Sequence, residues 1–328
     1  MKRGPLIGLA IATAGLLAVP HVITGEFYIN MASQVLIYAL FALSINLMLG
    51  YGGMVSLGHA AYLGVAGYTC ILLTIAGYDQ LLAAVAAVAL STAFAAVFGV
   101  LSLRAPGLGF IMITLAIGQI VWGIAYRANN LTGGDNGLSH PARPMPFGID
   151  IRDPMSFYYF TLIVFAIALF FLWRFARSPF GASLMGARDQ PRRMRMLGHN
   201  VYLVRLLTFV MAGFWGSIAS ILYVYYNLFL SPHALALQQS AEILLMAILG
   251  GVSSLTGPIV GAAVITLVKN VVSSYVERWN TLLGAIFVIV IIFMPLGIVP
   301  GCRQLWRRYR NRRKAPTPEQ KAASEPAA

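Results

Sequence analysis

Three titratable side chains lie inside strongly apolar stretches, where ionisable groups are costly and commonly functional: His59, Glu242 and Lys269. His59 could titrate near neutral pH or bind a metal. It has no second His, Cys or carboxylate nearby in the sequence, so we expect a hydrogen-bonded structural histidine. Glu242 and Lys269 either pair with each other or reach separately towards water from their apolar stretches.

Catalytic chemistry is not expected from this chain. No paired carboxylates, no cluster of metal ligands and no Ser/His/Asp set stands out in the apolar segments. We therefore predict no catalytic residue and no metal site.

The elements that hold these side chains are predicted to be membrane-spanning helices. Of 328 residues, 59% are hydrophobic and 10% are charged, whereas soluble domains carry about 25% charged residues. Apolar runs recur from Pro5 to Pro300 with the length of about 20 residues that crosses the hydrocarbon core as a helix. Because lipid offers backbone groups no other partner, we predict an all-α integral membrane protein with about 8–10 transmembrane segments, including discontinuous or re-entrant helices.

The order of these segments follows from the apolar runs. Spans are expected at 5–24, 31–49, 54–75, 81–103, 108–126, 155–173, 204–226 and 282–299, with a broken stretch at 240–272. The first is expected to be a retained span, because no small-residue cleavage site of a signal peptide stands out. Residues 1–302 would form one transmembrane domain, and 303–328 a basic and then disordered tail.

Basic residues concentrate in two segments, which predicts the orientation. The central segment 174–205 holds seven (Arg174, Arg177, Arg188, Arg192, Arg193, Arg195 and Arg205), and the tail holds eight (Arg303, Arg307, Arg308, Arg310, Arg312, Arg313, Lys314 and Lys321). Cytoplasmic loops carry such an excess, so this segment and both termini are expected in the cytoplasm. Nucleic-acid binding is not expected, because no base-stacking aromatics interleave with the basic residues.

The central segment 174–205 is a polar interruption between two spans. It predicts a short helix, a second helix that Pro191 starts, and a stop at Gly198. An Arg-rich segment of this kind is typical of contact with a soluble partner, and the alternative is a solvated cluster that only fixes topology. The residues of interest are Gly181, Arg188, Asp189, Arg192, Arg193 and Gly198.

Two further stretches, rich in glycine, interrupt the apolar pattern. The first contains Gly52, Gly53, Ser56, Gly58 and His59, and the second contains Gly250, Gly251, Ser253, Gly257 and Pro258. Such residues predict helix breaks that line a path, and close helix packing is the alternative. Gly53, Val55, Ser56 and Gly64 recur at a constant offset as Gly250, Val252, Ser253 and Gly261, either by chance or as an internal repeat.

The predicted external loop 127–153 contains one more glycine-rich stretch. Its residues of interest are Gly133, Gly134, Asp135, Asn136 and Gly137. A phosphate loop is excluded, because no lysine in the chain follows a glycine. We expect a structured turn with Asn and Gly at positive φ, or a docking site for an extracytoplasmic partner.

Four stretches, taken in their order and spacing, resemble one known family. Leu49 to Tyr62, Thr132 to Leu138, Gly181 to Gly198 and Leu249 to Gly261 are similar to the LivM-type permease subunit of branched-chain amino-acid importers of the ATP-binding-cassette (ABC) class. The similarity covers about 31–300. It implies a multi-pass protein of the bacterial inner (plasma) membrane with a LivH-like second permease, two cytosolic ABC ATPase subunits and an extracytoplasmic solute-binding protein as partners.

The resemblance also implies a mechanism. Segment 174–205 would be the coupling loop that lies in a groove of an ATPase, so that this chain binds no cofactor and ATP is used by the partner subunits. Its sequence from Gln190 to Met196 is more basic than is usual in the family and suggests an acidic groove.

The expected function is half of a translocation pathway for branched-chain amino acids or related small solutes such as amides, urea or carboxylates. The alternative is a stand-alone ion-coupled transporter, which would need membrane-embedded titratable groups as working parts. His59, Glu242 and Lys269 are few for that purpose.

Overall fold

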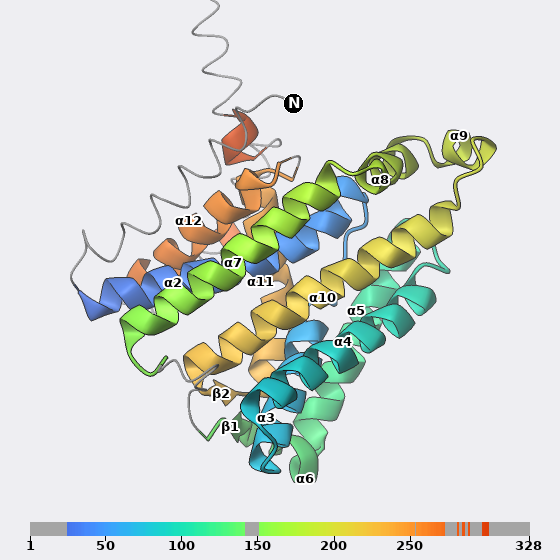
Figure 1. Ribbon diagram of the computed structural model, residues 1–328. Helices are drawn as coiled ribbons and strands as arrows, with labels where there is room; N and C mark the ends of the chain where they lie inside the picture. The colour runs from blue at the N-terminus through green and yellow to red at the C-terminus, as the bar shows by residue number, and fades with distance from the viewer. Residues whose placement is uncertain are drawn as a thin grey trace, which may run out of the picture.

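The computed structural model describes residues 25–141, 151–252, 254–272, 281, 284–285, 288 and 297–301. Within these ranges the chain is a bundle of helices, with strands only in one two-stranded pairing (Figure 1). The prediction of an all-α integral membrane protein is confirmed. The expected span 5–24, most of 282–299 and the tail 303–328 lie outside the described residues.

The elements follow the apolar runs of the sequence closely. They are α2 (Glu26–Asn46), η1 (Leu47–Tyr51), α3 (Ala60–Ile75), α4 (Gln80–Ser102), α5 (Leu108–Arg127), α6 (Asn129–Thr132), η2 (Gly134–Asn136), β1 (Leu138–Ser139), α7 (Pro154–Ala176), α8 (Pro179–Asp189), α9 (Pro191–Met196), α10 (Val201–Asn227), β2 (Phe229–Leu230), η4 (Pro232–Leu235), α11 (Leu237–Gly250) and α12 (Thr256–Val272). Here η1 is a π-helical turn that continues α2, and η2 and η4 are 3₁₀ turns.

Five helices among the described residues are long and apolar enough to cross a membrane. They are α2 together with η1, α4, α5, α7 and α10. Two shorter apolar helices, α3 and α11, begin or end at the glycine-rich stretches. The expected single segment 54–75 is therefore an irregular stretch, 52–59, followed by the shorter helix α3.

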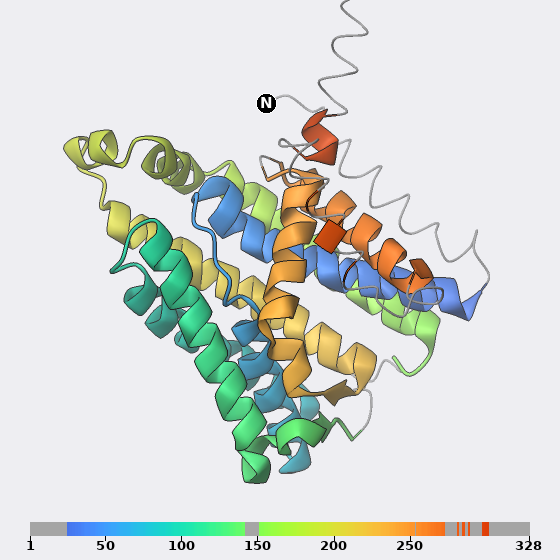
Figure 2. The same cartoon turned by 180° about the vertical axis from the view of Figure 1, so that it is seen from behind.

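Helix α2 lies at the centre of the bundle. It packs against α7, α10, α11 and α12, and its side chains are buried from Leu36 to Asn46. Seen from behind, α11 crosses α2 (Figure 2). A second packing layer joins α10 to α3 and α4, where Tyr62, Phe98 and Phe209 make edge and tilted ring contacts.

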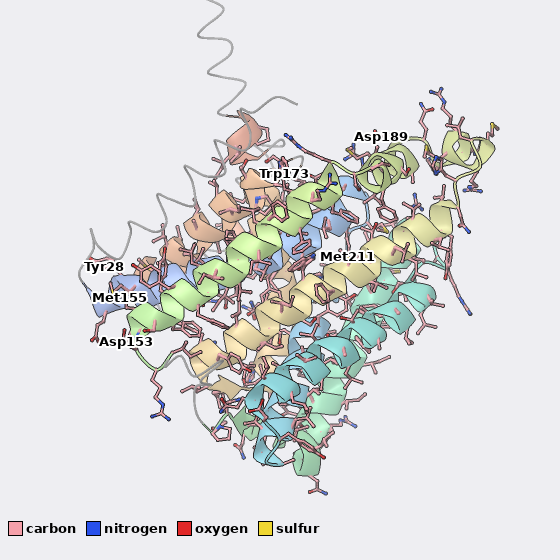
Figure 3. All side chains as sticks on the ribbon, in the orientation of Figure 1. Tyr28, Asp153, Met155, Trp173, Asp189 and Met211 are labelled. Atoms are coloured by element: carbon pink, nitrogen blue, oxygen red, sulfur yellow. The ribbon has the colours of Figure 1, made fainter. Side chains whose placement is uncertain are left out.

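The two ends of the bundle differ in charge. Asp189 marks the end that carries α8 and α9, here named the α8 end, and Asp153 lies at the opposite end with Tyr28 (Figure 3). Basic residues gather at the α8 end: Arg104, Arg174, Arg177, Arg188, Arg192, Arg193, Arg195 and Arg205. The opposite end carries Glu26, Asp79, Asp135 and Asp153 together with Arg127 and Arg152. The described charges are thus strongly asymmetric along the bundle.

Candidate functional site

Helices α8 and α9 form the predicted polar segment between two long spans. The Ser178 hydroxyl accepts a hydrogen bond from the backbone N–H of Gly181 at 3.2 Å, which caps the start of α8. Pro191 lies in the first turn of α9, and Gly198 follows with φ at 83°. The predicted sequence of a short helix, a proline-started helix and a glycine stop is confirmed.

One face of α8 is fixed to the bundle. Leu184 and Ala187 are buried, and a Cβ on Gly181 would lie 2.6 Å from the carbonyl oxygen of Phe175. Nη2 of Arg205, in the first turns of α10, donates a hydrogen bond to the carbonyl oxygen of Ala187 at 3.1 Å. Helix α8 is therefore held against the ends of both neighbouring spans.

Arg188 joins α8 to the first glycine-rich stretch. Its Nη1 donates a hydrogen bond to the carbonyl oxygen of Gly50. Its aliphatic stem lies against Gly53, where an added Cβ would be 2.6 Å from Cγ of Arg188 and φ is 65°. Only glycine combines that backbone conformation with so close a neighbour. Arg188 thus faces the bundle.

Asp189 accepts a hydrogen bond from Nε of Arg188 at 2.8 Å. This hydrogen bond lowers the pKa of the Asp189 carboxyl, and the positive charge of Arg188 adds to the effect. Because both side chains are partly exposed, the pair contributes little to stability by itself. Its main effect is to orient the Arg188 guanidinium group.

Arg192 and Arg193 behave differently from Arg188. Both lie on α9, which has no buried residue, and both are exposed. Within the part of the chain that the structure describes, neither side chain makes a hydrogen bond or an ion pair. They can therefore contact another molecule without breaking a contact of this chain.

The first break, 52–59, runs through the bundle as an irregular chain between η1 and α3. Its backbone passes directly against α5: a Cβ on Gly58 would overlap the carbonyl oxygen of Thr114, and one on Gly118 would lie 2.9 Å from the Gly58 Cα. The Leu57 N–H donates to Oγ1 of Thr114 at 3.3 Å, and the Gly58 N–H donates to Oγ of Ser56 at 3.4 Å. The glycine here serves close packing.

His59 lies at the end of this break and is completely buried. Its Nε2 is 2.7 Å from Oγ of Ser44, which donates its hydrogen to the carbonyl oxygen of Phe41 at 2.7 Å. With that hydrogen committed, Ser44 accepts from Nε2–H of His59. Within the described residues no group of three His, Cys, Asp or Glu could hold a metal ion. The geometry is that of a structural histidine.

The second break separates α11 from α12. Added Cβ atoms on Gly250 and Gly261 would overlap the carbonyl oxygens of Gly257 and Met246, so the two helices approach backbone to backbone. Gly251 has φ at 111°. Pro258 lies in the first turn of α12. Ser253, also predicted here, lies outside the described residues.

The two breaks meet in space. Nδ2 of Asn46 donates a hydrogen bond to the carbonyl oxygen of Ser254 at 3.2 Å, across 208 residues of sequence. A Cβ on Gly50 would overlap the carbonyl oxygen of Val252. Because Arg188 binds the carbonyl oxygen of Gly50, a series of contacts runs from α8 through Gly50 to the second break.

The breaks also have similar surroundings. The offset between Gly53 and Gly250 is 197 residues, and Ala60–Ile75 shifted by this amount coincides with 257–272, which falls within α12. At both breaks an apolar helix ends, an irregular stretch follows and a second helix starts. This correspondence agrees with the internal repeat that the sequence left open.

Glu242 and Lys269 form an ion pair. Nζ of Lys269 donates to both carboxylate oxygens of Glu242, at 3.0 and 3.1 Å. The Glu242 side chain is only 3% exposed, and the Lys269 amine also lies 5.8 Å from the ring centre of Tyr38. Of the two alternatives taken from the sequence, the structure has the pair, which joins α11 to α12.

The glycine-rich loop at the opposite end has the expected compact turn. Gly133, Gly134 and Gly137 have φ at 73°, 59° and 67°. The expectation of a positive φ at Asn136 is wrong, because Asn136 lies within the 3₁₀ turn η2 and the flanking glycines take the left-handed positions. Asp135 lies 3.6 Å from Nε2 of His233, an exposed pair.

This loop is also joined to the segment after α10. Strand β1 pairs with β2, with Leu138 opposite Leu230. The sequence did not predict this link, since two-residue strands have no periodic signal.

Sequence reasoning also missed Asn46, Gly50 and Arg205 as members of the site. Asn46 is a fully buried amide in an apolar run, a signal that could have drawn attention to it. The contacts of Gly50 and Arg205 depend on tertiary packing alone.

Comparisons with known proteins agree on one family. A family model described as "Branched-chain amino acid transport system / permease component" matches residues 27–294. The high-affinity branched-chain amino acid transport system permease proteins LivM of Salmonella typhimurium and Escherichia coli are each 25% identical over 301 residues, which cover 84% of this chain and 70% of theirs. The corresponding LivH protein of Escherichia coli is 22% identical over 296 residues, 80% of this chain and 91% of its own. No solved structure matches the chain significantly.

Proposed function

The chain belongs to the family of permease components of branched-chain amino acid transport systems, and we propose that it is the membrane-spanning permease subunit of an ATP-driven importer. It forms half of a translocation pathway for a branched-chain amino acid or a related small solute such as an amide, urea or a carboxylate. The other half is a LivH-like permease, and similarity to both LivM and LivH supports such a pair. An extracytoplasmic binding protein delivers the solute.

The observation that carries this proposal is the connection of α8 to both helix breaks, directly to the first and through Gly50 to the second. Arg188 connects α8 to Gly50, and Gly50 lies against Val252 of the second break. Packed elements transmit small shifts as changes between discrete arrangements. A force applied to α8 from outside the bundle therefore reaches the two places where the helices are interrupted.

The source of that force is a pair of cytosolic ATPase subunits. Arg192 and Arg193 are exposed on α9, beside α8, and supply positive charge for an acidic groove. We assign Arg188 to transmission within the chain and Arg192 and Arg193 to contact with the ATPase. ATP is bound and hydrolysed by the partners, and this chain needs no cofactor.

The charge asymmetry supports an orientation in the bacterial inner membrane. The α8 end carries the excess of arginine and faces the cytoplasm, together with both termini. The opposite end, where the glycine-rich loop is joined to the segment after α10, faces the extracytoplasmic side and receives the binding protein.

The rival function is a single-chain transporter driven by an ion gradient. Each of the titratable groups it would use is already engaged by a side chain of this fold. Glu242 is neutralised by Lys269, and His59 is held by Ser44 in a completely buried position. This arrangement favours the importer subunit.

Purification of the chain from its native membrane tests the assembly. We expect the wild-type chain to recover a second permease and ATPase subunits in fixed ratio. Replacing Arg192 and Arg193 with Glu should release the ATPase but keep the second permease, because α9 makes few contacts with the bundle. The control is Arg127→Glu, an exposed arginine in the last turn of α5 at the opposite end of the bundle. Recovery of the wild-type chain alone would contradict the proposal.

A further inference from the structure

Two adjoining cavities open at the α8 end, beside the start of α10. One of about 410 Å³ lies against Gly53 and Phe110, and the other of about 550 Å³ lies against His199 and Tyr202. They share the lining residues Leu103, Pro106 and Arg205. Each has the size of a small-molecule site, about 300–1,000 Å³.

The lining of these cavities is cationic. Arg195 and Arg205 both line the larger cavity, where their charges repel each other, and His199 lies beside them. None of the described residues that line either cavity is acidic. Nη2 of Arg205 donates a hydrogen bond to the carbonyl oxygen of Ala187. The Nε of Arg205 is buried and has no hydrogen-bond partner in the described part of the chain. Arg205 therefore brings a positive charge to the lining and has a donor that the described residues leave unpaired.

Helix α10 adds to this field. Its first residues, Val201 and Tyr202, line the larger cavity, so the positive end of a 27-residue helix lies at the site. Asn200 caps this end through a hydrogen bond from the Leu203 N–H at 3.1 Å. The cap satisfies one N–H and leaves the electrostatic preference for an anion in place.

The surroundings of the site are apolar and exposed. Leu108 lines the smaller cavity, and the exposed Met196, Leu197 and Leu203 lie within two residues of lining residues in the sequence, with Met196 87% exposed. Leu108 begins α5 and Leu203 lies in the first turn of α10, two helices that are long and apolar enough to cross a membrane, and Met196 and Leu197 lie at the end of α9. Cationic donors above exposed apolar side chains match a charged headgroup above its acyl chains.

We propose that these cavities bind the phosphate headgroup of an anionic phospholipid. Arg195 and Arg205 hold the phosphate oxygens, because guanidinium groups match phosphate geometry. A zwitterionic amino acid fits the lining less well, because its ammonium group would have no acidic partner there. The bound headgroup relieves the repulsion between the two arginines and steadies the turn between α9 and α10. Binding at this site needs no other subunit.

Native mass spectrometry of the purified full-length chain in detergent tests the site. Phosphatidylglycerol and phosphatidylcholine with the same acyl chains are added separately, and inorganic phosphate is added as a competitor. We expect stronger retention of phosphatidylglycerol than of phosphatidylcholine. Arg195→Gln should weaken phosphatidylglycerol binding about tenfold, as expected for the loss of one charge-assisted hydrogen bond.

Two variants serve this test. Arg205→Gln should have a larger effect but also removes the bond to Ala187, so the exposed Arg195 is the decisive position. Arg193→Gln removes the same charge from α9 at a residue that lines neither cavity, and should leave lipid retention by the isolated chain unchanged. Equal retention of both lipids, unaltered binding by Arg195→Gln, or displacement of the lipid by equimolar inorganic phosphate would overturn the proposal.

Discussion

Arg188 in α8 donates a hydrogen bond to the carbonyl oxygen of Gly50, which lies 138 residues earlier in the chain. Gly50 belongs to the π-helical turn that ends α2, and it also lies against the backbone of Val252 in the second helix break. A polar segment between two spans is thereby fixed to both interruptions of the helical bundle. This relationship is the structural basis of the proposed coupling.

The first prediction concerns this hydrogen bond. In the assembled importer, Arg188→Gln should keep ATP hydrolysis and assembly but lower solute uptake per ATP about tenfold, since a hydrogen bond from a charged group contributes about 1.5–3 kcal/mol and this one is partly exposed. Uptake and phosphate release are measured in the same proteoliposomes. Arg127→Gln removes the same charge at the opposite end and is the control. Parallel loss of hydrolysis and uptake would show that Arg188 acts in ATPase docking instead.

The second prediction concerns the close approach at Gly50. Gly50→Ala should destabilise the chain by about 1–3 kcal/mol, because overpacking forces backbone shifts, and the added methyl group would meet the Val252 carbonyl and Oδ1 of Asn46. Thermal unfolding of the purified protein measures the change. Gly123→Ala, on α5 with nothing within 4 Å of the added atom, should leave stability equal or raise it. Similar effects of both substitutions would remove the argument from close packing.

Much of the fold follows from the sequence for physical reasons. The lipid requirement for internal hydrogen bonding makes each apolar run a helix, so α4, α5, α7 and α10 begin and end within a few residues of the expected positions. Pro191 marks the start of α9 and Gly198 the stop after it, because the backbone preferences of proline and glycine are local.

The tertiary contacts of the candidate site could not be predicted from local sequence patterns. The sequence treats Arg188, Arg192 and Arg193 alike, and only packing decides that Arg188 faces Gly50 and the other two face outwards. The hydrogen bond from Asn46 to Ser254 links residues 208 positions apart, and no periodicity predicts such a pairing. Whether Lys269 pairs with Glu242 or extends towards water likewise depends on how α11 packs against α12, which the sequence does not show.

The third prediction concerns the ion pair between α11 and α12. Glu242→Lys places two cations side by side in a buried position and should destabilise the chain by about 3–5 kcal/mol, the usual effect of an unpaired buried charge. Glu242→Lys combined with Lys269→Glu should recover most of the folded protein, measured by monodispersity and thermal unfolding. Equal damage by the single and double variants would contradict a stabilising pair at this position.

The most direct test of the central claim is solute uptake by reconstituted protein under two driving forces. The chain is placed in proteoliposomes alone, and together with its second permease, ATPase subunits and binding protein, with either ATP on the ATPase side or an ion gradient. The account predicts uptake only for the complete assembly with ATP, and none for the single chain with a gradient. Gradient-driven uptake by the single chain would contradict it.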